Sequence, residues 1–198
     1  MASQTDQADM VLHLLGELPQ TQLCKMTQGN EVGNTILHEA ATSNKFVRAA
    51  REMLLIAPEL LPILNDYGET ALFRAARYGK IDMFNFLDKE FKNKYSDQDL
   101  KTFHRKKDKS ATMLHASIIG AQFDVAYEIA QRYKYLVSEK DSDGMTGLQH
   151  LSRDETTFRK RRGNLMRFIN SYSPGWIFPW LEASRKEAER YDSALKLA

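Results

Sequence analysis

Cysteine is almost absent from this chain, because Cys24 is the only one among 198 residues. A single thiol cannot form an internal disulfide, and we interpret Cys24 as a buried residue of a protein from a reducing compartment. Long apolar runs are also missing, since none approaches the roughly 18 residues that span a bilayer. The first residues have neither a basic segment nor an apolar core, so we expect no signal peptide and a cytoplasmic location.

Catalytic and ligand-binding motifs are missing as well. There is no glycine-rich phosphate loop, no G-x-S-x-G and no H-E-x-x-H. The five histidines show no metal-ligand spacing with one another or with Cys24. Asp141-Ser142-Asp143-Gly144 is similar to a calcium loop, but His150 stands where the bidentate glutamate is needed. We therefore expect no enzyme, no metal and no cofactor.

Charge gives little guidance to a partner. The formal net charge is only +2, which is too small to indicate nucleic-acid binding by itself. The basic excess lies in the second half of the chain. We expect no nucleic-acid partner, and a monomer and an oligomer are both compatible with the sequence.

One short motif occurs four times. Its copies are Thr35-Ile36-Leu37-His38-Glu39-Ala40-Ala41, Thr70-Ala71-Leu72-Phe73-Arg74-Ala75-Ala76, Thr112-Met113-Leu114-His115-Ala116-Ser117 and Thr146-Gly147-Leu148-Gln149-His150-Leu151-Ser152. Repeats at this spacing bury their apolar faces by stacking on neighbours, which favours a binding surface over a catalytic pocket.

The same sequence pattern surrounds each copy of the motif. A turn residue precedes each threonine by two positions: Gly33, Gly68, Ser110 and Gly144. Each threonine can then cap a short helix, whose leucine and small residues form one face. A break follows nine residues after the threonine, and in the first three copies a second apolar-periodic helix comes next. His38 and His115 occupy equivalent positions, and we interpret both as hydrogen-bonding partners of the turns.

These motifs resemble the ankyrin repeat, whose core is T-P-L-H-x-A, although proline is absent from all four copies. The resemblance covers residues 30–169. Residues 33–41 and 141–149 are similar to the plant ankyrin proteins of the accelerated-cell-death type. Relatives in that branch carry a C-terminal membrane domain near a Pro-Gly-Gly, where this chain has Pro174-Gly175-Trp176. The resemblance implies an all-α ankyrin-repeat solenoid, a protein partner, and a link to plant defence or stress signalling.

The expected organisation has three parts. Residues 1–29 are a polar tail, up to residue 8, and a capping half-repeat with helices over 10–18 and 20–26. Residues 30–171 hold four ankyrin repeats over about 30–64, 65–106, 107–140 and 141–171. The second repeat is long, and Ser96 is a candidate N-cap for an inserted helix. Residues 172–198 contain an aromatic break and a C-terminal helix.

The turn tips and one stripe of the first helices are the expected partner-binding surface. This stripe falls at the first, fourth and eighth positions after each threonine. Tyrosine and arginine are typical interface anchors. By analogy with ankyrin repeats, the predicted contact residues are Glu31, Glu39, Asp66, Tyr67, Glu69, Arg74, Tyr78, Lys109 and Met145.

A second candidate surface is the basic run Arg159, Lys160, Arg161 and Arg162. Such a run can be a solvated loop, a weak contact with anionic membranes or a nuclear import signal. Trp176, Phe178 and Trp180 lie nearby, and aromatic side chains favour membrane interfaces. A peripheral membrane location and a nuclear location therefore remain alternatives, as does a truncated relative of membrane ankyrin proteins.

Overall fold

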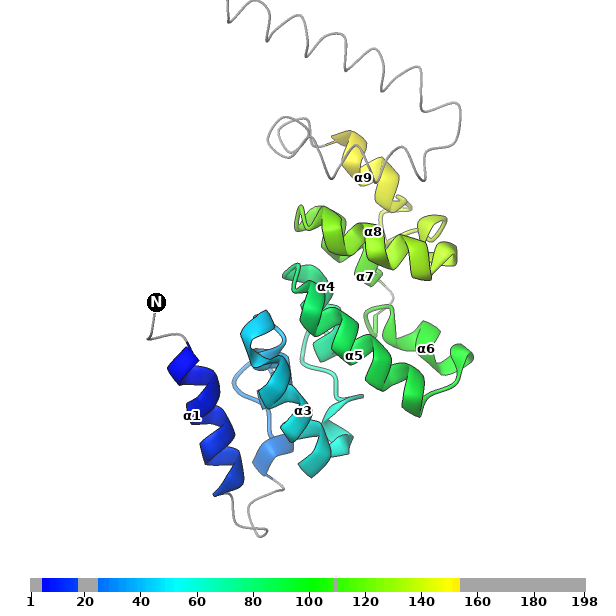
Figure 1. The fold of residues 1–198 in the computed structure, drawn as a ribbon. Helices are drawn as coiled ribbons and strands as arrows, with labels where there is room; N and C mark the ends of the chain where they lie inside the picture. Colours follow the sequence, from blue (N-terminus) through cyan, green and yellow to red (C-terminus); the bar gives the residue numbers. More distant parts are fainter. Residues whose placement is uncertain (1–4, 18–24, 109, 154–198) are drawn as a thin grey trace, which may run out of the picture.

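A computed structural model describes residues 5–17, 25–108 and 110–153 (Figure 1). The described residues form helices and connecting turns, and they contain no β-strand. The helices are α1 (Thr5–Gly16), α2 (Ile36–Ala40), α3 (Val47–Ile56), α4 (Ala71–Arg77), α5 (Ile81–Lys94), α6 (Asp97–Phe103), α7 (Met113–Ile119), α8 (Phe123–Arg132) and α9 (Gly147–Arg153). The prediction of an all-α repeat solenoid is confirmed.

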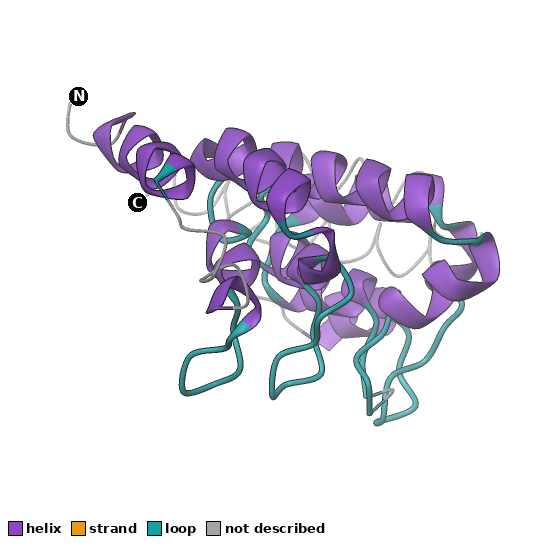
Figure 2. Cartoon of the chain, turned by 90° about the horizontal axis from the view of Figure 1, so that it is seen from below, coloured by secondary structure: helices purple, strands orange, loops and turns teal. Residues whose placement is uncertain are grey.

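The helices stack in two layers. The short first helices α2, α4, α7 and α9 follow one another in one layer, and the second helices α3, α5 and α8 form the other. Short 3-10 segments flank two of the second helices. η3 (Asn44–Phe46) leads into α3, and η4 (Pro58–Leu60) and η5 (Lys134–Val137) follow α3 and α8. Figure 2 shows the loops before the first helices projecting side by side from one side of the stack.

Small side chains allow this close packing. Ala40, Ala41, Ala75 and Ala76 are buried between the layers, together with the leucine at the second position after each of the first three threonines. Phe73 stands where the first and third copies have histidine, and it is fully buried. The core is therefore continuous along the stack, as a repeat solenoid requires.

The N-terminal cap differs from its prediction. Helix α1 already begins at Thr5, so the polar tail is shorter than the eight residues expected. Its partly buried Val11 and Leu12 and its buried Leu15 belong to the core, and the helix packs on α3. The second predicted cap helix falls largely on residues 18–24, which lie outside the described residues, as does Cys24. Residues 25–27 form a short 3-10 turn.

The inserted helix of the second repeat is confirmed as α6. The Ser96 hydroxyl accepts a hydrogen bond from Asp99 N at 3.3 Å, which caps the first turn. Phe91, Tyr95 and Phe103 pack their rings together, with centroids 4.9–5.7 Å apart. The insertion thus has its own aromatic anchor on the end of α5.

The C-terminal predictions fall on residues 154–198, outside the described residues. They include the second half of repeat four, the aromatic break, the C-terminal helix and the basic run Arg159–Arg162. Of repeat four, the described part contains the first helix, α9. No helix in that part is long and apolar enough to cross a membrane.

Candidate functional site

Four projecting loops, here called fingers, precede the first helices. Each is closed by a backbone hydrogen bond between its two ends, and the fingers are residues 30–34, 65–69, 106–111 and 141–145. In finger one, Asn30 Oδ1 accepts hydrogen bonds from Val32 N and Asn34 N at 3.1 and 3.0 Å. Asn65 and Asp141 act in the same way in fingers two and four.

Each finger is joined to the next by a backbone hydrogen bond. The pairs are Asp66 N to Val32 O at 3.2 Å, Lys107 N to Gly68 O at 3.0 Å and Ser142 N to Ser110 O at 2.9 Å. The tips therefore form one row along one side of the stack (Figure 2). Such a row can act as a continuous binding surface.

His38 and His115 fix fingers two and four to the first helix of the preceding repeat. His38 Nε2 lies 2.9 Å from Glu69 O, and His115 Nε2 lies 3.0 Å from Met145 O. A carbonyl oxygen can only accept, so Nε2 carries the proton and Nδ1 accepts from the backbone N–H of the capping threonine. Burial lowers the pKa of both rings, which keeps them neutral. Their predicted structural role is confirmed.

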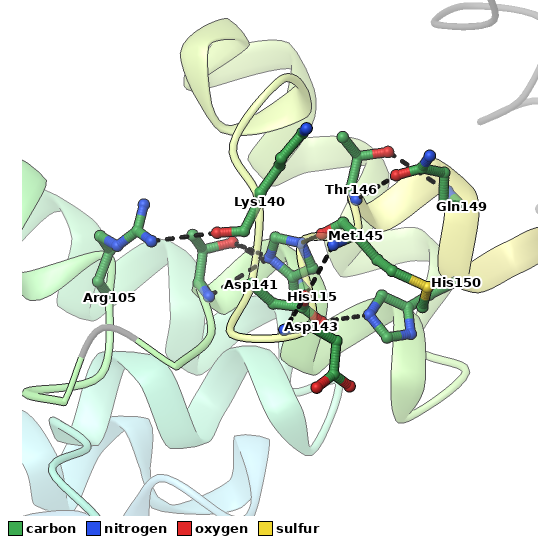
Figure 3. Close-up of polar contacts among 10 residues, drawn as sticks. Arg105, His115, Lys140, Asp141, Asp143, Met145, Thr146, Gln149 and His150 are labelled. Carbon is green, nitrogen blue, oxygen red and sulfur yellow. Dashed lines mark hydrogen bonds and ion pairs between the residues drawn. The ribbon is translucent and has the colours of Figure 1, made fainter.

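Finger four shows the arrangement most fully (Figure 3). Asp141 accepts from two backbone N–H groups and pairs with His150. Gln149 stands at the histidine position, and its Oε1 accepts from Thr146 N at 2.8 Å. The side chain of Asp141 is thus committed to the turn. No group of three metal-ligating side chains is assembled in the described part of the chain.

Five of the predicted contact residues lie on the exposed surface. Glu31, Asp66 and Tyr67 stand on fingers one and two, and Glu39 and Tyr78 lie on the first helices. Tyr67 is 54% exposed and Tyr78 is 43% exposed, which is unusual for aromatic side chains. Met145 is half-buried at the base of finger four. Lys109 lies outside the described residues.

The predicted exposure is wrong for Glu69 and Arg74, which are only 1% and 8% exposed. Glu69 forms ion pairs with Arg77 and with Lys106 of finger three, at 3.4 Å for the lysine. Arg74 lies between Glu39 and the ring of Tyr78. A repeat-by-repeat pattern cannot show this burial, because it depends in part on Glu39 of the first repeat and Lys106 of finger three.

The exposed stripe also needs correction at its first position. Ala71 and Met113 follow the threonine directly, and both are fully buried. The first position lies one helical turn from the fifth, so it shares the small-residue face rather than the solvent face. Ile119, seven positions after Thr112, is 63% exposed and was missed. Position seven lies one helical turn after position four, which was predicted to be exposed, and this spacing could have revealed the exposure of Ile119.

Comparison with protein families gives one match, and a comparison with curated proteins found none. The matching family model describes ankyrin repeats in three copies, and it covers residues 1–99, which is half of the chain. The matched region includes α1 to α5, fingers one and two, and the start of the inserted helix. In the structure a finger precedes a first and then a second helix along the stack. Together with this order, the match shows that the chain belongs to the ankyrin-repeat family.

Proposed function

We propose that this chain is a non-catalytic module that binds another protein through its fingers and the exposed stripe of its first helices. Ankyrin repeats are generally protein-interaction modules. The observation that carries the proposal is the exposure of Tyr67 and Tyr78 on a rigid, hydrogen-bonded scaffold. Tyrosine buries a large area with few rotatable bonds, so it anchors interfaces at low entropic cost.

The setting that we propose is an adaptor in plant defence or stress signalling, located in the cytoplasm. The similarity of residues 33–41 and 141–149 to plant proteins of the accelerated-cell-death type supports this proposal. The similarity concerns the biological setting, and the proposed binding surface does not depend on that setting.

Proximity labelling in plant cells tests the binding function. The intact chain is compared with the double variant Tyr67→Ala/Tyr78→Ala, which removes both exposed rings. A discrete set of labelled proteins should be lost in this variant, while the thermal unfolding midpoint stays nearly unchanged because both side chains are exposed.

Leu55→Ala is the matched control, since Leu55 is 71% exposed on α3 in the other helix layer. It should label the same proteins as the unchanged chain. An identical labelling pattern for the double tyrosine variant would contradict the proposed surface.

A second candidate function is peripheral attachment to anionic membranes through the four consecutive basic residues Arg159–Arg162. Flotation of the intact chain with vesicles of anionic phospholipid tests it at low and high salt. Attachment that is lost at high salt, and lost when all four residues are changed to glutamine, would support it. If the chain does not float with the vesicles at low salt, membrane attachment is excluded.

A further inference from the structure

Arg74 is a buried cation whose hydrogen-bonding capacity is not used. Its Nε is buried and has no acceptor among the described residues. Glu39 Oε2 lies 3.8 Å from Nη2, which is beyond hydrogen-bonding distance. The guanidinium carbon lies 5.4 Å from the centre of the Tyr78 ring. Buried donors without acceptors are rare and costly. The Arg74 side chain keeps 10% of its surface exposed, and a ligand could accept a hydrogen bond from the guanidinium there.

Glu39, the neighbour of Arg74, is connected to fingers one and two by hydrogen bonds. Glu39 Oε1 accepts from Asn30 Nδ2 at 3.2 Å and from Asn34 Nδ2 at 2.8 Å. Asn65 Nδ2 donates to Asn34 Oδ1 at 2.8 Å. Arg74, Glu39 and the bases of both fingers therefore form one surface, and its shape is fixed before any ligand binds.

This surface is acidic. Glu31 and Asp66 are exposed on the two finger tips, and neither has an ion-pair partner within the described residues. Glu39 adds a third carboxylate, half-exposed, beside Arg74. Arg74 offsets the charge of Glu39, but an anionic ligand would meet repulsion from Glu31 and Asp66, whereas lysine and arginine side chains would be attracted.

The two exposed tyrosines fit the same ligand. The ring of Tyr67 can hold the aliphatic stems of basic side chains or stack on a guanidinium. The ring of Tyr78 already faces the Arg74 guanidinium and offers its second face. Arg74 excludes a second cation from its own position, but it can donate to an uncharged oxygen. A backbone carbonyl is the acceptor that every extended peptide offers.

We propose that fingers one and two, with Glu39, Arg74 and Tyr78, bind an extended basic segment of a partner protein. In this arrangement Arg74 donates to a backbone carbonyl of that segment, and Glu31 and Asp66 pair with its lysine or arginine side chains. The inference rests on the proposed protein-binding function and specifies the chemistry of the partner.

Selection from a displayed library of random linear peptides against the intact chain tests this inference. Peptides rich in lysine and arginine with interspersed apolar residues should be enriched. The double variant Glu31→Gln/Asp66→Asn should bind a selected synthetic peptide about tenfold more weakly, mainly through slower association. The difference should shrink at high salt, because both carboxylates are exposed.

The matched control is Glu52→Gln/Glu59→Gln, which makes the same change in net charge at exposed positions of the other layer. It should bind the selected peptide normally. Arg74→Met, which keeps the stem and removes the donors, should lose about tenfold in affinity even at high salt, because a buried donor is screened little. Arg74→Lys should recover part of this loss.

Three outcomes would overturn the inference. Enrichment of acidic peptides, failure of any sequence class to be enriched, or equal affinity of the control and the finger variant would each exclude a basic segment at this surface. Proximity labelling that still depends on Tyr67 and Tyr78 would then preserve the proposed function with a partner of different chemistry.

Discussion

The buried histidines show how single residues set the response of the whole fold to pH. His104 is fully buried at the end of α6, and its Nδ1 lies 2.5 Å from the Tyr135 hydroxyl. Its ring lies against Tyr133, with centroids 4.1 Å apart. Burial lowers the pKa of His104 to about 4, with Asp88 opposing this shift and Lys92 adding to it. The neutral ring is therefore part of the native state.

The chain should lose stability as the pH falls from 6.5 toward 4. The unfolded chain binds a proton at His104 in this range and the native chain does not, so acid favours unfolding. This group alone should lower the free energy of unfolding on the order of 3 kcal/mol by pH 4. Burial lowers the pKa of His38 and His115 as well, and they add in the same direction.

Urea unfolding at several pH values measures this loss. His104→Gln should be less stable than the unchanged chain at neutral pH, but its stability should depend less on pH. His13→Gln is the control, because His13 is exposed on α1. Parallel pH profiles for the unchanged chain and His104→Gln would show that another group is responsible.

At the scale of elements, local patterns in the sequence predicted most of what the structure shows. The threonine that opens each copy is the N-cap of α2, α4 and α7. Ser96 was recognisable as a cap because serine before a helical segment accepts from the exposed N–H groups of the first turn. Helix α1 was predicted too short, because its polar first turn contains no apolar periodicity to mark its start.

The finger tips offer a test of how closely neighbouring elements are coupled. Gly68 and Gly144 have nearly the same backbone conformation, with φ of 69° and 72°. A methyl group at Gly68 would lie 2.8 Å from Lys107 Cβ and 2.9 Å from Lys107 N, whereas nothing lies within 4 Å at Gly144. The two positions thus share the same conformational strain and differ in crowding.

Gly144→Ala should lower the free energy of unfolding by about 1 kcal/mol, which is the cost of a left-handed conformation. Gly68→Ala should cost about 1–3 kcal/mol more, because the added methyl group pushes fingers two and three apart. Denaturant unfolding of both variants gives the difference directly. An equal loss of unfolding free energy in the two variants would mean that fingers two and three can move apart to accommodate the methyl group at little cost.

At the scale of the whole molecule, the sequence could not reveal which polar side chains are buried between repeats. Glu69 and Arg74 follow the pattern of solvent-facing positions, yet Lys106, Arg77, Glu39 and their neighbours enclose them. Their partners come from other repeats as well as from the second repeat itself. Periodicity within one unit therefore carries no information about this burial.

Asp88 is the buried carboxylate that couples the second and third repeats. It lies on α5 and is 2% exposed. It accepts from the Tyr133 hydroxyl, from Lys92 Nζ at 2.9 Å and from Arg132 Nη1 at 2.9 Å. Tyr133 follows α8 and Arg132 ends it, so one side chain joins the second helices of two repeats. In a solenoid, such nearest-neighbour interfaces decide how cooperatively the units unfold.

Asp88→Ala should lower the free energy of unfolding by about 2 kcal/mol, because it leaves the buried Tyr133 hydroxyl and two partly exposed cations without their acceptor. Tyr133→Phe should cost about 1 kcal/mol, since Asp88 keeps both cations. Lys89→Ala, at an exposed position of α5, should be nearly neutral. Hydrogen exchange in Asp88→Ala should accelerate in α5 and α8 and leave α2 protected, because the weakened interface separates the stack at that point. Uniform acceleration across α2, α5 and α8 would instead show that the described repeats unfold as one unit and that Asp88 stabilises all of them equally.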